Sequence, residues 1–508
     1  MAVSPVGGTV HIPSVTSWMF SALVFSWAGA KCAWISFSCA TSPYRVSGSG
    51  LVAQEREIQA HFAPAQEKTN AENIQLVTDG MWTVPPTGET ATEYLTDYVE
   101  EDGVRIATNM SDTVRYHAMA NTDYPSRNEF DAPHVSLQAE TVMPESLITS
   151  IQPHYQVPHA PDLPEYFRYA LRVAGPLLAL GVNSPFFPPD LYDDAPDCEV
   201  LDDAHMEHRV GVFESVLNPP EGHEEPPKVC FPPDFGTVED AIDDIAADTC
   251  IVPMDVTPAD RFDDAFAHFR HKHGSYWRWV RPVFDGATRS EANARIEFRP
   301  LPAQPTIRDC VAFEAVFAGL MESLPRFEHP VRRLDWETAE DNFYAAARDG
   351  LQADIAWLTT DGAETTDIDV ICNELFEYAR DGLEGRGLSA EQAHEYIRPL
   401  RERLDRRTTP ARWKHERVRS AVEVSGTPTS TADRTRSCFQ RAGVVRRSSR
   451  SRSGRTYPWA CSAERPRPSR PSRAYSNNSL QMTSISVVSA PSVVSQAMSA
   501  WRPSRAAA

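Results

Sequence analysis

The charge alternation at the start of residues 293–306, NARIEFRPLPAQPT, constrains the fold more than any other part of the chain. In an extended strand, successive side chains point to opposite faces. A strand here would bury its apolar residues and place Arg295, Glu297 and Arg299 together on the other face. A solvated sheet surface produces the same alternation. The sequence of the neighbouring segments is therefore needed to distinguish a buried ionic site from a solvent-exposed surface.

The segment upstream predicts a second strand. Residues 275–282, SYWRWVRP, alternate so that Trp277, Trp279 and Arg281 share one face. The dipeptide at 285–286, Asp-Gly, is typical of a turn. We therefore expect the two strands to turn their polar faces into one hollow.

A helix is predicted directly after these strands. Thr306 and Asp309 form an approximate capping box, and residues 311–324 are mostly apolar. Further helices are expected over residues 368–381 and 389–405. The local order around the charged strand is thus strand, turn, strand and helix.

A third strand with a polar face is predicted over residues 147–157. Its apolar side chains fall mainly on one face, and Gln152 and His154 fall on the other. These two would supply a metal or phosphate ligand, although a single His is more often a hydrogen-bonded structural residue. Pro153 removes a backbone donor, so an edge strand or a bulged strand is expected.

Two helices adjoin this predicted hollow. The first is capped by Asp162, carries an apolar stripe and runs into an irregular break whose Asn183 and Ser184 would face a ligand. The second ends at Gly350 just after Arg348. An Arg near a cleft clamps phosphate or carboxylate, whereas an Arg on a solvated helix end binds nothing.

The charge distribution divides the chain into two kinds of sequence. The net charge is -21, but residues 425–508 carry fourteen Arg against one Asp and one Glu. The preceding part is therefore strongly acidic, and it contains all five lysines. An acidic, lysine-poor surface is typical of proteins in a salty cytoplasm, and it argues against nucleic acid as a partner of the core.

The remaining composition excludes several classes of protein. The nine cysteines are scattered without a CxxC pair, which favours a reduced, cytoplasmic setting. The apolar run at 18–30 is too short to span a bilayer, so no membrane partner is expected. His268, His271 and His273 fit no standard zinc spacing.

We expect one catalytic domain between two atypical ends. Residues 1–50 show no period and receive no assignment, residues 51–423 form the domain, and residues 424–508 form an Arg/Ser/Pro-rich disordered tail. Within the domain, residues 187–260 are acidic and proline-rich and are interpreted as an insertion or lid. The abrupt change of composition at both ends resembles translation in a shifted reading frame.

Several short motifs follow one another in an order that is more specific than any one of them. They are Gln152 and His154 on a strand, the helix and turn at 167–186, Arg281–Pro282, IEFR at 296–299 with QPT at 304–306, and NFYAAARDGL at 342–351. In this order they resemble the glutamate-cysteine ligase type 2 (carboxylate-amine ligase) family over roughly residues 51–420. The acidic, lysine-poor composition resembles that of a haloarchaeal member.

The resemblance implies a fold and a reaction. The fold is α+β and glutamine-synthetase-like, with an antiparallel sheet, helices on its outer face and disordered ends. The reaction is that of an ATP-dependent ligase, in which the side-chain carboxylate of glutamate is phosphorylated and the amine of cysteine, or another amine, displaces phosphate to form an amide. The partners are therefore small molecules, and the sequence carries no signature of an oligomeric state.

The same resemblance gives roles to the residues named above. Glu297, aided by His154, would bind Mg2+. Arg299, Arg281 and Arg348 are the expected catalytic residues, because they stabilise charge on a transferring phosphoryl group or hold the substrate carboxylates. The residues expected to bind ATP or the substrates are Gln152, Asn183, Ser184 and Arg295.

One departure from the family pattern leaves two alternatives open. Family members begin with a Glu-x-Glu strand and a further acidic strand, and neither is recognisable in residues 1–50. A degenerate protein of the same fold would bind ligands without turning them over. A nucleic-acid-binding protein acting through the basic tail would show salt-sensitive binding that deletion after Val424 abolishes.

Overall fold

The computed structural model describes residues 14–22, 24–25, 35–40, 44–71, 75–85, 88–110, 114–252 and 261–425. All of them belong to one compact unit, Met1–Arg447. Within these ranges no helix is both long and apolar enough to cross a membrane. The predicted disordered tail lies outside the described residues, apart from residues 424–425 at the end of the last helix.

The largest sheet is antiparallel throughout, with the strand order β11, β12, β10, β1, β3 and with β4 also paired to β1. Four two-stranded sheets pair β2 with β5, β6 with β7, β8 with β9 and β13 with β14. The strands are β1 Ser14–Ala22, β2 Val24–Phe25, β3 Ile35–Ala40, β4 Tyr44–Arg45, β5 Gln75–Leu76, β6 Tyr98–Glu101, β7 Val104–Ala107, β8 Glu129–Ala132, β9 Val135–Gln138, β10 Ile151–Gln156, β11 Val280–Asp285, β12 Asn293–Phe298, β13 Trp357–Leu358 and β14 Glu364–Thr365.

Helices surround this sheet. They are α1 Gly48–Ala71, α2 Ala91–Thr96, α3 Val114–Ala120, α4 Leu163–Gly181, α5 Asp197–Asp203, α6 Arg209–Leu217, α7 Val238–Ala247, α8 Ala267–His273, α9 Ile307–Ser323, α10 Trp336–Asp349, α11 Ile368–Gly385, α12 Ala390–Arg406 and α13 Pro410–Ser425. Short 3-10 helices include η1 Met143–Leu147 and η4 Phe262–Phe266.

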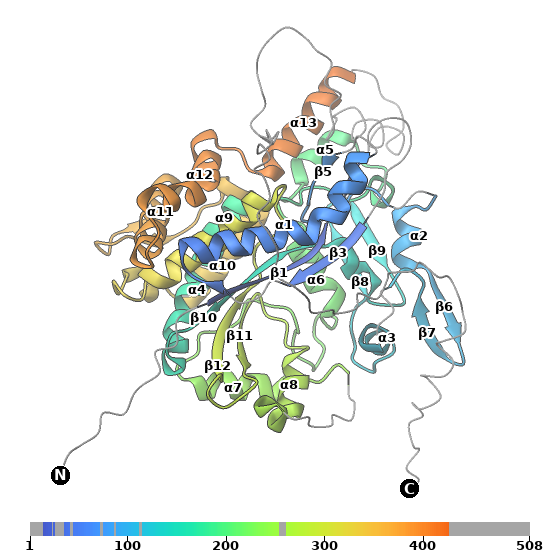
Figure 1. The fold of residues 1–508 in the computed structure, drawn as a ribbon. Helices are drawn as coiled ribbons and strands as arrows, with labels where there is room; N and C mark the ends of the chain where they lie inside the picture. The colour runs from blue at the N-terminus through green and yellow to red at the C-terminus, as the bar shows by residue number, and fades with distance from the viewer. Residues whose placement is uncertain are drawn as a thin grey trace, which may run out of the picture. The chain divides into compact units, whose positions relative to one another are not determined.

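Two helices cover one face of the main sheet and form the core with it. α4 packs on β11 and β12, and α9 packs on β10 and β1. α10 lies against α4, and α11 and α12 lie against α9 as a second layer (Figure 1). The predicted apolar stripe of α4 is fully buried, namely Phe167, Ala170, Leu171, Ala174, Leu177 and Leu178. The predicted α+β architecture, with helices on one face of an antiparallel sheet, is confirmed.

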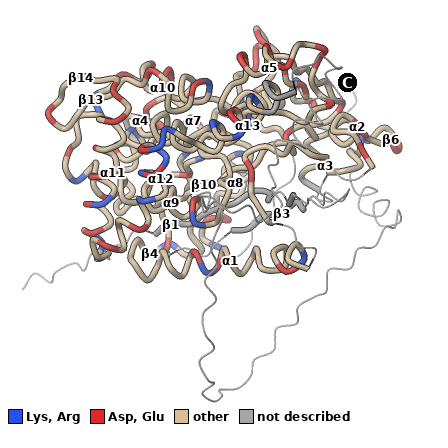
Figure 2. The backbone as a smooth tube through the Cα atoms, turned by 90° about the horizontal axis from the view of Figure 1, so that it is seen from above, with Lys and Arg blue, Asp and Glu red and all other residues tan. Residues whose placement is uncertain are grey.

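The acidic composition is carried by the outer parts of the molecule. Figure 2 shows Asp and Glu along peripheral elements such as α5 and β6, interspersed with Arg and Lys. All four residues of β6 are exposed, including Glu100 and Glu101. Because the acidic side chains lie on these outer elements, the main sheet and the helices that pack on it can form an apolar core.

The helix boundaries follow the expected signals with some exceptions. Thr306 caps α9, because its hydroxyl accepts the Asp309 amide at 3.1 Å. α10 ends at Gly350, whose φ of 58° favours glycine. Asp162 precedes α4 and Asp335 precedes α10, but neither side chain accepts a capping hydrogen bond. The predicted cap at Asp162 is therefore wrong, although both helices are present.

Pro64 lies inside α1, which continues through it to Ala71. The helix buries Leu51, Ile58, Phe62 and Ala65 along one face, on both sides of the proline. This continuous apolar face outweighs the one backbone hydrogen bond that proline removes.

The range 1–50, which received no assignment from the sequence, contributes β1, β2, β3, β4 and the first residues of α1. β1 pairs with β10 on one side and with β3 on the other, so it is an interior strand of the sheet. Its sequence, SVTSWMFSA, mixes polar and apolar residues at both sets of alternate positions. A period of two is therefore missing, and only the pairing with distant strands defines this element.

β10 was expected to be an edge strand or a bulged strand because of Pro153. It is not at the edge, since β1 and β12 flank it. The bulge is present: the Ile151 amide bonds to the Leu301 carbonyl, whereas His154 is opposite Glu297. Between these two pairs the chain that follows β12 therefore contains one residue more than β10. This bulge lies next to Pro153, whose backbone has no N–H to donate, and it allows an interior strand to contain proline.

The acidic segment 187–260 was interpreted as an insertion or lid, but its described part, 187–252, is built into the body. α6 buries Val212, Phe213 and Val216, and the segment also buries the charged side chain of Lys228. The apolar residues of α6 form only two helical turns between proline pairs. A helix this short gives too little periodicity to be recognised in a sequence dominated by proline and acidic residues.

Candidate active site

One row of side chains crosses three strands on the face opposite α4 and α9. The ladder between β10 and β12 sets His154 opposite Glu297, and the ladder between β11 and β12 sets Arg281 opposite the same Glu297. Directly opposed residues in an antiparallel pair project from the same face. The register therefore gathers the three predicted polar strands at Glu297.

Glu297 is the centre of a buried ionic cluster. Its Oε2 lies 2.8 Å from Nη2 of Arg281 and 3.4 Å from Nε2 of His154, and its Oε1 lies 3.4 Å from Nε of Arg299. The side chains of Glu297 and His154 are almost completely buried. With neutral His154, the side chains of Glu297, Arg281 and Arg299 taken alone carry one excess positive charge, and the charge of Glu145 also acts on Arg299.

Burial and charge act in opposite directions on these groups. Burial would raise the pKa of Glu297, but the positive charges of Arg281 and Arg299, with His154 beside them, outweigh it and hold that pKa well below its usual range. Burial lowers the pKa of His154 to about 3, against the attraction of Glu297. Burial also lowers the pKa of Arg299 to about 10. At neutral pH the carboxylate and both guanidinium groups are charged and the imidazole is neutral.

Backbone carbonyls hold Arg281 in place. Its Nη1 donates to the carbonyl oxygens of His273 and Tyr276, both at 2.9 Å. The Nη2 atom is thereby aimed at Glu297. Arg281 thus joins the end of α8 to the sheet, and its orientation is fixed on two sides.

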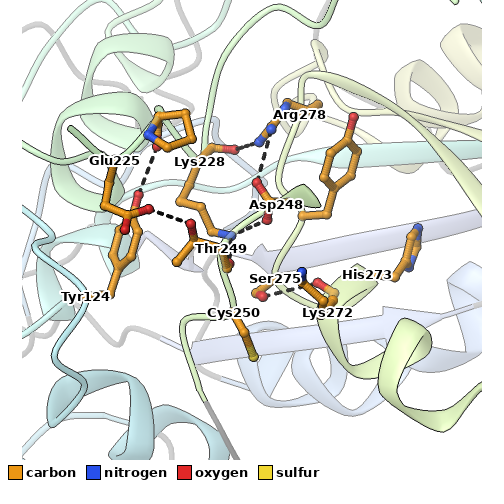
Figure 3. Close-up of polar contacts among 12 residues, drawn as sticks. Tyr124, Glu225, Lys228, Asp248, Thr249, Cys250, Lys272, His273, Ser275 and Arg278 are labelled. Carbon is orange, nitrogen blue, oxygen red and sulfur yellow. Dashed lines mark hydrogen bonds and ion pairs between the residues drawn. The ribbon is translucent and has the colours of Figure 1, made fainter. Parts of the chain in front are cut away.

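A second buried ionic network fixes the segment just before β11 (Figure 3). Asp248 accepts from Lys228 and, at 3.1 Å, from Nη2 of Arg278. Nη1 of Arg278 also donates to the carbonyl of Lys228 at 2.6 Å. Two cations share one fully buried carboxylate here, and they tie the end of α7 to the chain that leads into Trp279 and Arg281.

Aromatic rings from α6 and from Trp279, the residue just before β11, lie beside the cluster. The guanidinium carbon of Arg299 lies 4.9 Å from the ring centre of Phe213, and that of Arg209 lies 5.1 Å from the ring centre of Trp279. Arg209 pairs with Glu207 at 3.3 Å and donates to the carbonyl of Pro300. The sequence patterns did not indicate Glu207, Arg209 or Phe213, because these three lie in the acidic segment that lacks a recognisable period.

Two further predicted residues lie beside the cluster. Gln152 is buried two residues before His154 on β10, where its Nε2 donates to Ser150 Oγ at 3.1 Å. Arg295 pairs with Asp285 at 2.9 Å. Its positive charge acts on His154, where it contributes to the lowered pKa. Both residues therefore share the face that carries Glu297.

Asn183 and Ser184 were predicted to face a ligand, but both are fully buried in the turn after α4. The Asn183 amide donates to Glu207 Oε2 at 2.7 Å, and its Nδ2 donates to the Ala303 carbonyl at 2.7 Å. The Ser184 amide donates to the Met206 carbonyl at 3.3 Å. The turn thus links Met206 and Glu207 to Ala303.

Arg348 was predicted to be catalytic, but it lies outside the cluster. Its side chain is 56% exposed, and its Nε pairs with the neighbouring Asp349 at 3.0 Å. The position of a helix end relative to a distant sheet depends on tertiary packing, which a helical pattern alone does not reveal. The exposure favours the solvated alternative, and these contacts give a catalytic role for Arg348 no support.

The described side chains show no preformed cluster of metal ligands. Among them no group of three or more His, Cys, Asp or Glu is placed to hold a metal ion. Both oxygens of Glu297 already face guanidinium groups, and Mg2+ needs several hard oxygen ligands that are not shared with cations. The assignment of Glu297 and His154 as metal ligands therefore stays a prediction. The His268–His273 segment likewise shows no metal geometry, since His273 Nε2 contacts the Pro282 carbonyl at 2.8 Å.

The fold and this cluster define an α+β protein with a buried, positively charged site on an antiparallel sheet. The family model of glutamate-cysteine ligase family 2 matches residues 38–441, and the chain belongs to that family. Its class is therefore that of the ATP-dependent carboxylate-amine ligases.

A solved structure also resembles the chain. It is the crystal structure of a glutamate–cysteine ligase from Francisella tularensis in complex with AMP, with 12% sequence identity and a TM-score of 0.41. The match covers 85% of this chain and 89% of that chain. A search of curated proteins finds no match.

Proposed function

We propose that the protein joins glutamate to cysteine in an ATP-dependent reaction that passes through a glutamyl phosphate. The observation that carries the proposal is the excess positive charge around Glu297, where Arg281 and Arg299 face one carboxylate. Among the described residues, Nη1 of Arg299 is buried without a hydrogen-bond partner. A buried donor without an acceptor is costly, so an oxyanion of a substrate is its natural partner.

The proposed reaction has two steps. An oxygen of the glutamate side-chain carboxylate attacks the γ-phosphorus of ATP, the bond to the ADP oxygen breaks, and ADP leaves. The amine of cysteine then attacks the acyl carbon, phosphate leaves with the bridging oxygen, and the amine proton passes to solvent. Charge develops on the transferring phosphoryl group, and fixed cations in a dry site stabilise such charge strongly.

The chain's own residues would divide the work. Arg299, through Nη1, and Arg281 would hold the oxyanions that react. Glu297 would keep both guanidinium groups in position, since it contacts each of them. Gln152 and Arg295, which lie on the same face, would contact the remainder of the substrates.

The proposal is tested by incubating the full chain with ATP, magnesium chloride, glutamate and cysteine in high salt and measuring ADP and the dipeptide. Hydroxylamine added in place of cysteine should yield glutamyl hydroxamate, which reports the acyl phosphate. The Arg299→Gln variant should lose both products, and the Arg348→Gln variant, changed at an exposed residue, should keep them. Binding of ATP without release of ADP would contradict the proposal and support a degenerate binding protein.

A further inference from the structure

The aromatic wall beside the cluster holds the guanidinium group that has an unused donor. Arg299 lies over the ring of Phe213, with 4.9 Å between the guanidinium carbon and the ring centre. Both side chains are buried, Arg299 to 8% exposure and Phe213 to 4%. A cation on an aromatic face is attracted more strongly when water is excluded. The contact therefore fixes the plane of the guanidinium group and covers one of its faces.

Phe213 is itself held by a second ring. The rings of Phe213 and Trp279 meet at 66° with centroids 5.5 Å apart. The other face of this pair carries Arg209, which lies over Trp279 at 5.1 Å and donates to the carbonyl of Pro300. Pro300 directly follows Arg299, so the backbone and the side chain of Arg299 are anchored to the same two rings.

A carboxylate closes this arrangement. Oε1 of Glu214 accepts from Nε1 of Trp279 at 2.7 Å and from the hydroxyl of Tyr344 at 2.8 Å. Glu214 follows Phe213 on α6, and Tyr344 belongs to α10. The indole is thus fixed by hydrogen bonds as well as by packing, and two helices outside the sheet determine where the rings lie.

We propose that Phe213 is the positioning residue of this site and that, with Trp279, it presents Nη1 of Arg299 to a phosphoryl or carboxylate oxygen of the substrate. Nε of Arg299 already faces Glu297 at 3.4 Å, and Nη1 is buried without a partner among the described residues. The Nε side of the guanidinium group contacts the Glu297 carboxylate, and one of its faces lies on the Phe213 ring. These two contacts hold the edge that carries Nη1 in a single direction. The identity of the bound oxyanion rests on the proposed function. The positioning role itself is inferred from the geometry of the rings around Arg299.

The kinetic test compares two phenylalanines of the same core. Phe213→Leu removes the ring under Arg299, Phe213→Tyr retains it, and Phe231→Leu is the matched control. Phe231 is also buried and packs on two other rings, those of Trp336 and Phe343. We expect Phe213→Leu to lower kcat/KM by about 5- to 30-fold, the range of a desolvated cation–π contact, with Phe213→Tyr near wild type and Phe231→Leu unchanged in kcat/KM.

Thermal unfolding separates this effect from a loss of packing. Both leucine variants should lower the melting temperature by similar amounts, because both remove a buried ring. Equal kcat/KM values for Phe213→Leu and Phe231→Leu, or failure of Phe213→Tyr to restore kcat/KM, would overturn the inference.

A binding measurement separates the inference from the proposed function. Titration calorimetry with inorganic pyrophosphate and with ATP needs no turnover. If the wild-type protein binds either anion and Phe213→Leu weakens that binding while Phe231→Leu does not, the positioning role holds even in a protein that makes no dipeptide. Binding that is insensitive to Phe213→Leu, or no binding of either anion, would reject it.

Discussion

Nε2 of His154 lies 3.4 Å from Oε2 of Glu297, across the ladder between β10 and β12. The two residues are far apart in sequence, and each was picked out because its neighbours alternate between apolar and polar. Their contact shows that both alternations face the same side of the sheet. The ionic interpretation of the charged strand is therefore correct, and the solvated-surface alternative fails because both side chains are buried.

Replacing Arg281 by Lys should impair the reaction far more than it impairs folding. Lys has one compact charge and cannot bond to Glu297, His273 and Tyr276 with the geometry of a planar guanidinium. We expect kcat/KM to fall by about 100-fold, as for loss of one preorganised donor. Steady-state kinetics would measure this. The matched variant Arg348→Lys, at an exposed position, should stay near wild type; a similar loss in both variants would contradict the prediction.

The Asp248→Asn variant should be strongly destabilised. It would leave Lys228 and Arg278 buried with no carboxylate between them. Breaking a buried pair by removing one partner costs about 3–5 kcal/mol. Urea unfolding would measure this free energy. The control Asp381→Asn, in an exposed pair with Arg380, should change it by less than about 1 kcal/mol, and equal effects of the two changes would refute the role of the buried network.

Two glycines should respond to alanine in opposite ways. A Cβ at Gly80 would lie 2.7 Å from Cβ of Pro302 and would collide with Ser184, so Gly80→Ala should destabilise by about 1–3 kcal/mol. A Cβ at Gly211, inside α6, would meet no heavy atom of the described residues within 4 Å beyond its own helix, so Gly211→Ala should stabilise by about 0.5–1 kcal/mol. Melting temperatures of the two variants would show a rise for one and a fall for the other; a fall for both would contradict the packing described around Gly80.

The pH dependence of stability should change in Glu214→Gln. Burial raises the pKa of Glu214 to about 7, although hydrogen bonds from Trp279 and Tyr344 oppose the shift. A raised carboxyl pKa means that the folded state binds the proton more tightly, so the stability from this group is present at acidic pH and is lost as pH rises from about 4.5 to about 7. Glutamine cannot ionise and should remove this loss.

Urea unfolding at several pH values between 5 and 8 would measure this loss of stability with rising pH. Wild type should lose more unfolding free energy over this range than Glu214→Gln, and the exposed variant Glu364→Gln should follow wild type. Parallel curves for wild type and Glu214→Gln would show that Glu214 does not titrate in this range.

The sequence predicted those parts of the site that repeat with a period. The β11–β12 hairpin, α4 and α9 are present because apolar faces and turn residues are local signals, although β11 begins later than the predicted strand over 275–282. Glu207, Arg209 and Phe213 lie in a segment where proline and acidic residues hide a two-turn helix. The contacts of Asn183, Ser184 and Arg348 differ from those expected, because a motif does not say whether its side chains bond to the backbone, to solvent or to a ligand.

The position of β1 bears on how the chain is made. β1 is synthesised long before its neighbour β10, although the two strands pair with Thr16 opposite His154. Long-range pairing of this kind slows folding and leaves strand edges open in the meantime. A shortened gene product that starts after Ala22 would expose the edge of β10 next to the ionic row, and we expect it to accumulate as inclusion bodies instead of as a less active enzyme.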